Sequence, residues 1–405
     1  MQKKHRLLAI GYAREGFGFG RVLQSLLRLL VHRYDIHQFE MTSTEETAWP
    51  WQVYRNQVRG DWFGTQQLPA LVEKVQPDLI LLAVEIWEIQ RYVQLFQKYL
   101  GKTRLVAYTP IDGPLKTSHY LEPLGALARL VVPTHFALRE LRQAFARECG
   151  MPIPHMEVIP HGVDTGAFYP YAAERARGRR QAREELFPAR PELQQAFIVF
   201  NGNRNQFRKR IDLTMQGFRL FAEGKSEHVK LYLHMGVVDK GVNILGYARQ
   251  YGILDRLLYT TPSKDHPVVD DTVLNRIYNA CDVGLNTSMG EGWGLVSFEH
   301  AATGAAQVVP EHSACEELWQ QAAIMLSAHP LDMEAALPFP VQMQEVRPEE
   351  IAASLELLYR NPQRLAELSL AALHNASRPE LQWSSIAARF DDLFQEVLHE
   401  KIVVR

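Results

Sequence analysis

The stretch that decides the fold reads, in order, VGLN at 283–286, GEGWGLVSFE at 290–299 and QVVP at 307–310. The two apolar flanks predict strands, and the residues between them predict a glycine-rich loop and a helix closed by Gly304. A helix N-terminus presents free N–H groups and the positive end of a dipole, so this layout favours a phosphate-bearing ligand. Glu291 and Glu299 flank the anion site, and their carboxylates suit the hydroxyls of a sugar and a ribose. The stretch therefore predicts a site for a sugar nucleotide.

The alternative interpretation of this stretch is an ordinary strand–helix turn with one surface glutamate and one helical glutamate. Glycines at positions 290, 292 and 294 favour the ligand site instead. Glycine lets the backbone approach a ligand closely or adopt left-handed conformations.

Composition and charge narrow the class of protein. The chain has 405 residues, 46% hydrophobic and 22% charged, and this length predicts two domains. A net charge of −2 gives no indication of a nucleic-acid partner. The cysteines, Cys149, Cys281 and Cys315, are odd in number and lack metal-ligand spacing, which argues against a disulfide framework or a metal site. We therefore expect a reducing, cytoplasmic location.

Membrane segments are not indicated by the sequence. The apolar run at 7–10 is too short for a signal-peptide core, and no stretch approaches the roughly 18 apolar residues of a membrane span. A helix expected at 134–147 carries Arg139, Arg142 and Arg147. Peripheral contact with the inner membrane face stays open on this ground, although a solvated helix face is the favoured interpretation.

Strands alternate with helices in two series, which predicts an α/β protein with parallel sheets covered on both faces. The expected strands lie at 7–10, 35–41, 79–84, 104–108, 128–132 and 158–164, then at 197–200, 230–234, 257–260, 283–286 and 307–310. The expected helices lie at 22–32, 134–147, 271–281, 349–376 and 384–399. We predict an N-terminal Rossmann-like domain (1–165), an interdomain segment (166–195), a C-terminal Rossmann-like domain (196–382) and a last helix (383–405). Two such domains imply a ligand cleft between them.

A second candidate segment, NGNRNQFRKR at 201–210, follows the strand at 197–200 and carries four basic residues within seven positions. Lysine and arginine at the carboxyl end of a strand can grip a diphosphate and neutralise the charge on a leaving phosphate. The alternative is a solvated basic helix start.

Two weaker candidates lie in the first half of the chain. The glycines of GFGFG at 16–20 are spaced G-x-G-x-G, so the dinucleotide fingerprint fails, and a tight turn competes evenly with a phosphate contact. Asp112 follows the strand at 104–108, where it is expected to face the cleft, and His119 nearby is a candidate for proton transfer or hydrogen bonding. A turn aspartate and a structural histidine are the alternatives, and His161 is likewise either functional or a turn residue.

With these residues in view, the chain resembles the retaining GT-B glycosyltransferases of family 4 over nearly its whole length. The strongest element is the E-x7-E pattern formed by Glu291 and Glu299, with ACDV at 280–283 before it. VIPHGVD at 158–164 is similar to the family's interdomain turn, with histidine in place of asparagine. QWS at 382–384 resembles the crossing that returns the chain to the N-terminal domain.

The resemblance implies a GT-B fold, in which two Rossmann-like domains face each other across a cleft and the C-terminal helix returns to the first. Glu299 would bind the donor ribose, and Glu291 the hydroxyls of the transferred sugar. Lys209 and an adjacent arginine would bind the diphosphate. Further donor contacts would come from Gly18, Phe19, Gly292, Trp293, Gly294 and Leu295.

Two departures from the family pattern affect these assignments. The family's diphosphate arginine usually follows the glycine after this strand, but Asn203 follows Gly202 here, so Arg204 is expected to substitute. Many members also carry a histidine after the strand that ends here at Tyr108. Either Asp112 or His119 takes that place on the acceptor side, and we count Asp112 with Glu291, Lys209 and Arg204 among the expected catalytic residues.

The expected function is therefore transfer of a sugar, with retention, from a nucleotide-diphosphate-sugar to a hydroxyl of a glycan, a lipid-linked molecule or a small molecule. The resemblance implies that no metal or other cofactor takes part, because basic side chains and helix dipoles replace it. The alternatives are a GT-B sugar-nucleotide epimerase or phosphorylase, and a non-catalytic protein that binds a sugar nucleotide or a glycan.

Overall fold

The computed structural model describes residues 4–12, 18–41, 48–147, 151–331 and 339–400. The chain divides into two compact units, Met1–Gly162 with Trp383–Arg405, and Val163–Gln382. The last helix therefore belongs to the first unit. Segment 166–195, which we predicted to be interdomain, belongs to the second.

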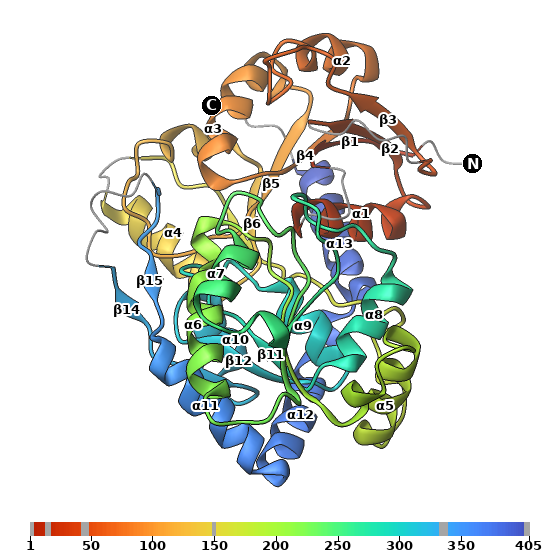
Figure 1. Ribbon diagram of the computed structural model, residues 1–405. Helices are drawn as coiled ribbons and strands as arrows, with labels where there is room; N and C mark the ends of the chain where they lie inside the picture. Colours follow the sequence, from red (N-terminus) through yellow and green to blue (C-terminus); the bar gives the residue numbers. More distant parts are fainter. Residues whose placement is uncertain (1–3, 13–17, 42–47, 148–150, 332–338, 401–405) are drawn as a thin grey trace. The chain divides into compact units, whose positions relative to one another are not determined.

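The first unit is built on a seven-stranded parallel sheet with the order β3-β2-β1-β4-β5-β6-β7 (Figure 1). The strands are β1 (Arg6–Gly11), β2 (Asp35–Glu40), β3 (Gln52–Arg55), β4 (Leu79–Ala83), β5 (Arg104–Tyr108), β6 (Arg129–Val132) and β7 (Met156–Val158). All five residues of β4, LILLA, are buried, as expected for a central strand covered on both faces.

The helices of this unit are α1 (Gly18–Leu30), α2 (Leu68–Val75), α3 (Ile86–Phe96), α4 (His135–Arg147) and α13 (Trp383–His399). Helix α13 packs against α1. Tyr34, just beyond α1, donates a hydrogen bond from its hydroxyl to Asp391 of α13 (2.7 Å), and Phe390 places its ring 4.9 Å from that of Tyr108. No helix in the described part of the chain is long and apolar enough to cross a membrane.

The second unit holds a six-stranded parallel sheet with the order β10-β9-β8-β11-β12-β13. Its strands are β8 (Phe197–Asn201), β9 (Val229–Leu233), β10 (Leu257–Tyr259), β11 (Val283–Leu285), β12 (Ala306–Pro310) and β13 (Ile324–Leu326). A separate antiparallel pair consists of β14 (His329–Pro330) and β15 (Gln344–Glu345). Both large sheets follow the doubly wound order, in which the strand sequence reverses beside the first strand of the unit.

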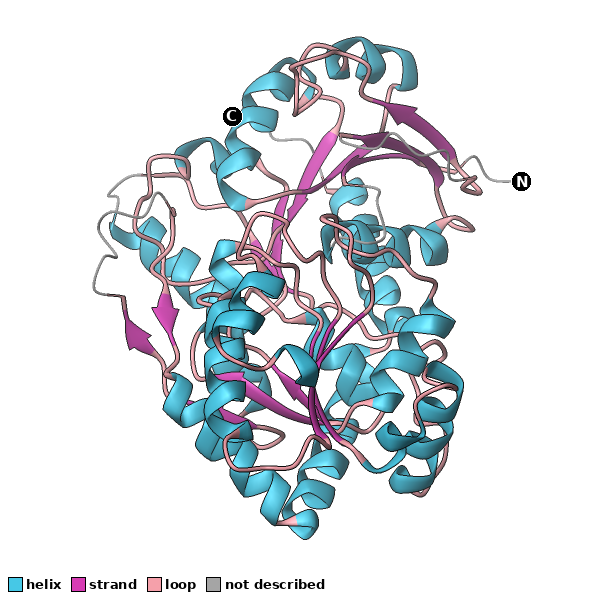
Figure 2. Cartoon of the chain, viewed as in Figure 1, coloured by secondary structure: helices cyan, strands magenta, loops and turns pink. Residues whose placement is uncertain are grey.

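Helices cover both sides of each sheet (Figure 2). Those of the second unit are α5 (Arg175–Leu186), α6 (Ile211–Ala222), α7 (Ile244–Gln250), α8 (Asp271–Ala280), α9 (Leu295–Ala302), α10 (Ser313–Trp319), α11 (Pro348–Arg360) and α12 (Pro362–Ala376). Alternate residues of β8 enter two different cores: Val199 packs with α6 and α11, and Ile198 and Phe200 pack with α8 and α9. This alternation is the two-residue period of a strand.

Most of the expected elements are confirmed, with local differences. The elements that were not predicted from the sequence are the strands β3, β13, β14 and β15 and the helices α2, α3, α6, α7 and α10. The helical stretch expected at 349–376 is two helices, because Pro362 lacks the N–H that would continue α11. The side chain of Asn361 instead accepts a hydrogen bond from Arg364 N (3.0 Å) and caps α12.

Three buried histidines give the fold an acid sensitivity that can be tested. Burial lowers the pKa of His161, His234 and His300 to about 3 each. Between that value and the ordinary pKa near 6.5, the unfolded chain binds protons that the folded chain excludes, so stability is full above pH 6.5 and falls as the pH falls. Each such histidine is expected to lower the free energy of unfolding by about 1.4 kcal/mol per pH unit in this range.

Thermal unfolding followed from pH 8 to pH 5 measures this effect. Replacing His161 by glutamine should make the decline below pH 6.5 shallower, whereas replacing the exposed His228 in the same way should leave it unchanged. An identical pH profile for His161→Gln and the wild type would contradict the assignment.

Candidate functional site

The candidate site lies where β8 and β11 run side by side in the second unit, at the point where the strand order reverses. Crevices at such points, beyond the carboxyl ends of the strands, are the usual ligand sites of doubly wound sheets. The loop after β8 contains Lys209, and the loop after β11 contains Glu291. The two sequence segments predicted to bind the donor thus meet in one place.

The loop after β8 is shaped to present Lys209. Asn201 accepts a hydrogen bond from Asn203 N (2.9 Å), which turns the chain at the end of the strand. A short 3-10 helix at Phe207–Lys209 follows and ends at Arg210, whose φ of 47° is left-handed. The Thr287 hydroxyl lies 3.0 Å from the carbonyl oxygens of both Lys209 and Arg210, so it can donate to them and tie this turn to the loop after β11.

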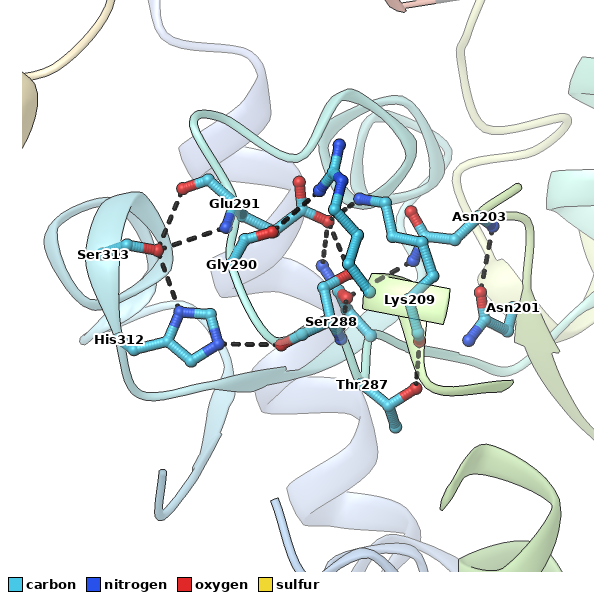
Figure 3. Close-up of polar contacts among 11 residues, drawn as sticks. Asn201, Asn203, Lys209, Thr287, Ser288, Gly290, Glu291, His312 and Ser313 are labelled. Atoms are coloured by element: carbon cyan, nitrogen blue, oxygen red, sulfur yellow. Dashed lines mark hydrogen bonds and ion pairs between the residues drawn. The ribbon is translucent and has the colours of Figure 1, made fainter. Parts of the chain in front are cut away.

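Glu291 is buried, with 5% of its surface exposed, and its Oε1 has three polar partners (Figure 3). Lys209 Nζ forms an ion pair with this oxygen. Ser288 Oγ donates to it at 2.8 Å and Asn286 Nδ2 at 3.2 Å. Three donors on a single oxygen fix the position of the carboxylate.

The electrostatics of the site keep Glu291 ionised. Burial alone would raise the pKa of its carboxyl group, but the positive charges of Lys209 and Arg208 and the hydrogen bonds from Lys209 and Ser288 outweigh burial. The resulting pKa is about 2. Glu291 is therefore an anion at neutral pH and can accept hydrogen bonds from hydroxyl groups.

The second cation of the site is Arg208, which directly precedes Lys209 and is one of the two arginines adjacent to it in the sequence. Its Nη1 donates to Gly290 O (2.9 Å), and its own carbonyl oxygen accepts from Met289 N (2.8 Å). Arg204, the predicted diphosphate ligand, instead forms an ion pair with Asp239, with Nε 2.6 Å from Oδ2. The role of Arg204 in binding the donor stays a prediction.

Helix α9 begins at the glycine turn, as predicted. Gly294 is its N-cap residue and has a φ of 89°, which glycine adopts without strain. Such a helix start leaves backbone N–H groups of the first turn without helical partners. Gly292 and Leu295 flank this turn, whereas the ring of Trp293 is buried and stacks on Phe298 at a centroid distance of 5.0 Å. The indole of Trp293 thus supports the turn from the core.

Glu299 lies on α9 and is also buried, with 5% of its surface exposed. Tyr278 of α8 donates its hydroxyl hydrogen to Glu299 Oε2 at 2.9 Å. This bond orients the carboxylate, and the role of Glu299 in binding the donor ribose stays a prediction.

The other predicted residues belong to the first unit. Gly18 and Phe19 start α1, and the ring of Phe19 lies 5.9 Å from that of Tyr12, while Gly16 falls outside the described residues. Asp112 is half-buried in the loop after β5, and His119 is exposed with its ring edge-on to Tyr120. The donor and acceptor roles of these four residues stay predictions.

Within the described residues, no group of three or more histidine, cysteine, aspartate or glutamate side chains is arranged to hold a metal ion. Arg139 and Arg142 are exposed on α4, and contact of this helix with a membrane stays a prediction.

Comparisons with known proteins relate the chain to glycosyltransferases. No protein-family model matches it. It is 28% identical over 234 residues to a D-inositol 3-phosphate glycosyltransferase of Xylanimonas cellulosilytica, and the matched region covers 56% of this chain and 51% of the relative. It is 24% identical over 319 residues to D-inositol 3-phosphate glycosyltransferase 2 of Catenulispora acidiphila, and the matched region covers 76% of this chain and 65% of the relative. The chain thus spans between half and two thirds of the length of these curated relatives.

Solved structures share the fold over nearly the whole chain. A sucrose-phosphate synthase of Thermosynechococcus elongatus has a TM-score of 0.73 at 14% identity, covering 97% of this chain and 99% of that chain. Anabaena HepE in complex with UDP-glucose has a TM-score of 0.71 at 14% identity, covering 96% and 99%. A UDP-forming trehalose-phosphate synthase of Burkholderia xenovorans has a TM-score of 0.69 at 13% identity, covering 99% and 100%. The predicted fold is confirmed: this chain has the GT-B fold that these solved structures share, and its sequence is similar to those of the two curated glycosyltransferases.

Proposed function

We propose that the protein is a retaining, metal-independent glycosyltransferase that uses a nucleotide-diphosphate-sugar as donor. The observation that carries this proposal is the buried ion pair between Lys209 and Glu291 at the reversal point of the second sheet. A cation and an anion held there, beside the start of α9 and close in sequence to Glu299, suit the two parts of a sugar nucleotide: the cation suits the anionic diphosphate, and the carboxylate can accept hydrogen bonds from the neutral sugar hydroxyls.

The donor fits this arrangement in three parts. Its diphosphate would be held by Lys209, Arg208 and the N–H groups at the start of α9, where cations and a helix dipole both favour negative charge. Its sugar hydroxyls would be held by Glu291, and its ribose hydroxyls by Glu299. On donor binding, Lys209 would exchange part of its contact with Glu291 for the phosphate, which frees the carboxylate to accept from the sugar.

The reaction needs no protein nucleophile. The bond from the anomeric carbon to the diphosphate oxygen breaks while the bond to the acceptor oxygen forms on the same face of the sugar. The acceptor hydroxyl gives its proton to an oxygen of the leaving diphosphate. Lys209 and Arg208 stabilise the charge that develops on that diphosphate, which is the preorganised electrostatic stabilisation that usually dominates such catalysis.

The relatives suggest the substrate class. One solved relative holds UDP-glucose and another is named as UDP-forming, so we infer a uridine diphosphate sugar as donor. The curated relatives are named for D-inositol 3-phosphate, and two solved relatives are named as synthases of sugar phosphates. We infer an acceptor of the same kind, a small polyol or sugar that bears a phosphate, with Asp112 and His119 as candidates for its contacts.

A thermal-shift panel of UDP, GDP, ADP and their sugar conjugates, with EDTA present throughout, tests donor binding. We expect one nucleotide family, that of UDP, to raise the unfolding temperature, since a ligand at about 100 times its Kd adds about 2.7 kcal/mol to the stability of the folded state. No shift with any nucleotide, from well-folded protein, would contradict the proposal. A shift that appears only when Mg²⁺ replaces EDTA would contradict metal independence.

A further inference from the structure

Ser313, the first residue of α10, has an unusual backbone conformation. Its φ is 47°, and it is 6% exposed. Among the described residues, only Gln76, Arg210 and Ser313 are non-glycine residues with a positive φ. A positive φ is unfavourable for a residue with a side chain, whereas glycine adopts it without strain. Arg210 follows Lys209 in the sequence, and Ser313 contacts the backbone of Glu291. Two of the three residues therefore adjoin the Lys209–Glu291 pair.

The side chain of Ser313 gives a reason for its presence there. Its Oγ accepts a hydrogen bond from Glu291 N at 3.3 Å and lies 3.0 Å from Glu291 O, to which it can donate. Ala314 N donates to the same carbonyl oxygen at 3.2 Å. The hydroxyl thus contacts both backbone polar groups of the glutamate, which glycine could not do.

His312 joins this contact to the other end of the loop. Its Nε2–H donates to Ser288 O (2.8 Å), and its Nδ1 lies 2.9 Å from Ser313 Oγ. In Figure 3 the imidazole lies between Ser313 and the backbone of Ser288. Ser288 in turn donates its hydroxyl hydrogen to the Glu291 carboxylate. His312 and Ser313 therefore hold both ends of the 288–291 turn.

We propose that Ser313, supported by His312, is a positioning residue that holds Glu291 in the orientation in which its carboxylate meets Lys209 and the donor sugar. Strained residues persist where the surrounding structure determines them and function uses them. The role in catalysis rests on the proposed function above, whereas the role in holding the turn does not.

Two variants separate the hydroxyl from the backbone conformation. Ser313→Ala removes the hydroxyl and keeps the unfavourable φ, whereas Ser313→Gly removes the hydroxyl and relieves the strain. We expect both to lower kcat at least 10-fold and to change the Kd of UDP less than about threefold. Hydrogen exchange at the Glu291 amide should accelerate at least 10-fold in both, since its acceptor is gone. Ser369→Ala, at another buried serine in the same unit, is the matched control and should change neither readout.

The outcomes are distinguishable. Wild-type kcat and wild-type amide protection in Ser313→Gly would overturn the proposal, because the hydroxyl would then be dispensable. Slow turnover in Ser313→Ala together with wild-type turnover in Ser313→Gly would also overturn the proposal, since backbone strain rather than the missing hydroxyl would then explain the loss of kcat. If the wild type turns over no donor but both variants still lose protection at Glu291, the proposed function fails and the positioning role stands.

Discussion

Replacement of Lys209 by alanine is expected to lower turnover by at least a hundredfold while the GT-B fold is kept. The lysine is 8% exposed and is the direct partner of the Glu291 carboxylate, so no solvent cation can fully take its place. Removing a preorganised charge that stabilises a developing anion typically costs about a hundredfold to a thousandfold in kcat. The same substitution leaves Glu291 buried without its cation, which typically costs about 3–5 kcal/mol of stability.

Two controls separate the loss of catalysis from the loss of stability. The double variant Lys209→Met, Glu291→Gln removes both charges, so it should recover most of the stability and none of the turnover. Lys225, near the opposite end of α6, pairs with Glu356 at 2.6 Å, and Lys225→Ala should leave turnover unchanged. Steady-state kinetics beside thermal unfolding measures all of these variants. Near-normal kcat in folded Lys209→Ala would remove the lysine from the mechanism.

Replacement of Glu299 by alanine is expected to weaken nucleotide binding by about 10- to 150-fold. This range corresponds to the loss of one charge-assisted hydrogen bond, about 1.5–3 kcal/mol. Calorimetric titration with UDP measures it. Glu299→Gln keeps the side-chain volume and an acceptor for Tyr278 but removes the negative charge. Any loss of UDP affinity in Glu299→Gln relative to the wild type therefore comes from the charge.

Tyr278→Phe is the matched control for this residue. It keeps the Glu299 carboxylate but removes the hydroxyl that orients it at 2.9 Å, so binding should weaken by less than in Glu299→Ala. Equal affinity for UDP in the wild type and Glu299→Ala would exclude the carboxylate from the nucleotide site and shift the proposed ribose contact elsewhere.

The sequence predicted the architecture because its signals are local. Buried strands such as LILLA at Leu79–Ala83 are continuous apolar runs, and the alternation with helices repeats in both halves of the chain. Lys209 and Glu291 lie 82 positions apart, yet both were expected at carboxyl ends of strands in one sheet. Parallel strands bring such ends to one edge, which is why the pairing of the two segments could be anticipated.

Other parts of the site depend on contacts that no local pattern reveals. The ion pair of Arg204 with Asp239, 35 residues later in the chain, and the hydrogen bond from Arg208 Nη1 to Gly290 O could not be read from the sequence. Ser313 and His312 are ordinary residues in the sequence, and only the fold places them against the glutamate loop. The antiparallel pair β14–β15 has two residues in each strand, too few to show a period.

The most direct test of the central claim is sugar transfer itself. The protein is incubated with UDP-glucose and a panel of polyol and sugar phosphates, and release of UDP is followed together with the anomeric configuration of the product by NMR. We predict UDP release that requires an acceptor, a product with the α configuration of the donor, and release at least a hundredfold slower by Lys209→Ala. Absence of release from folded wild-type protein that binds UDP would contradict a transferase, and a β-configured product would contradict retention.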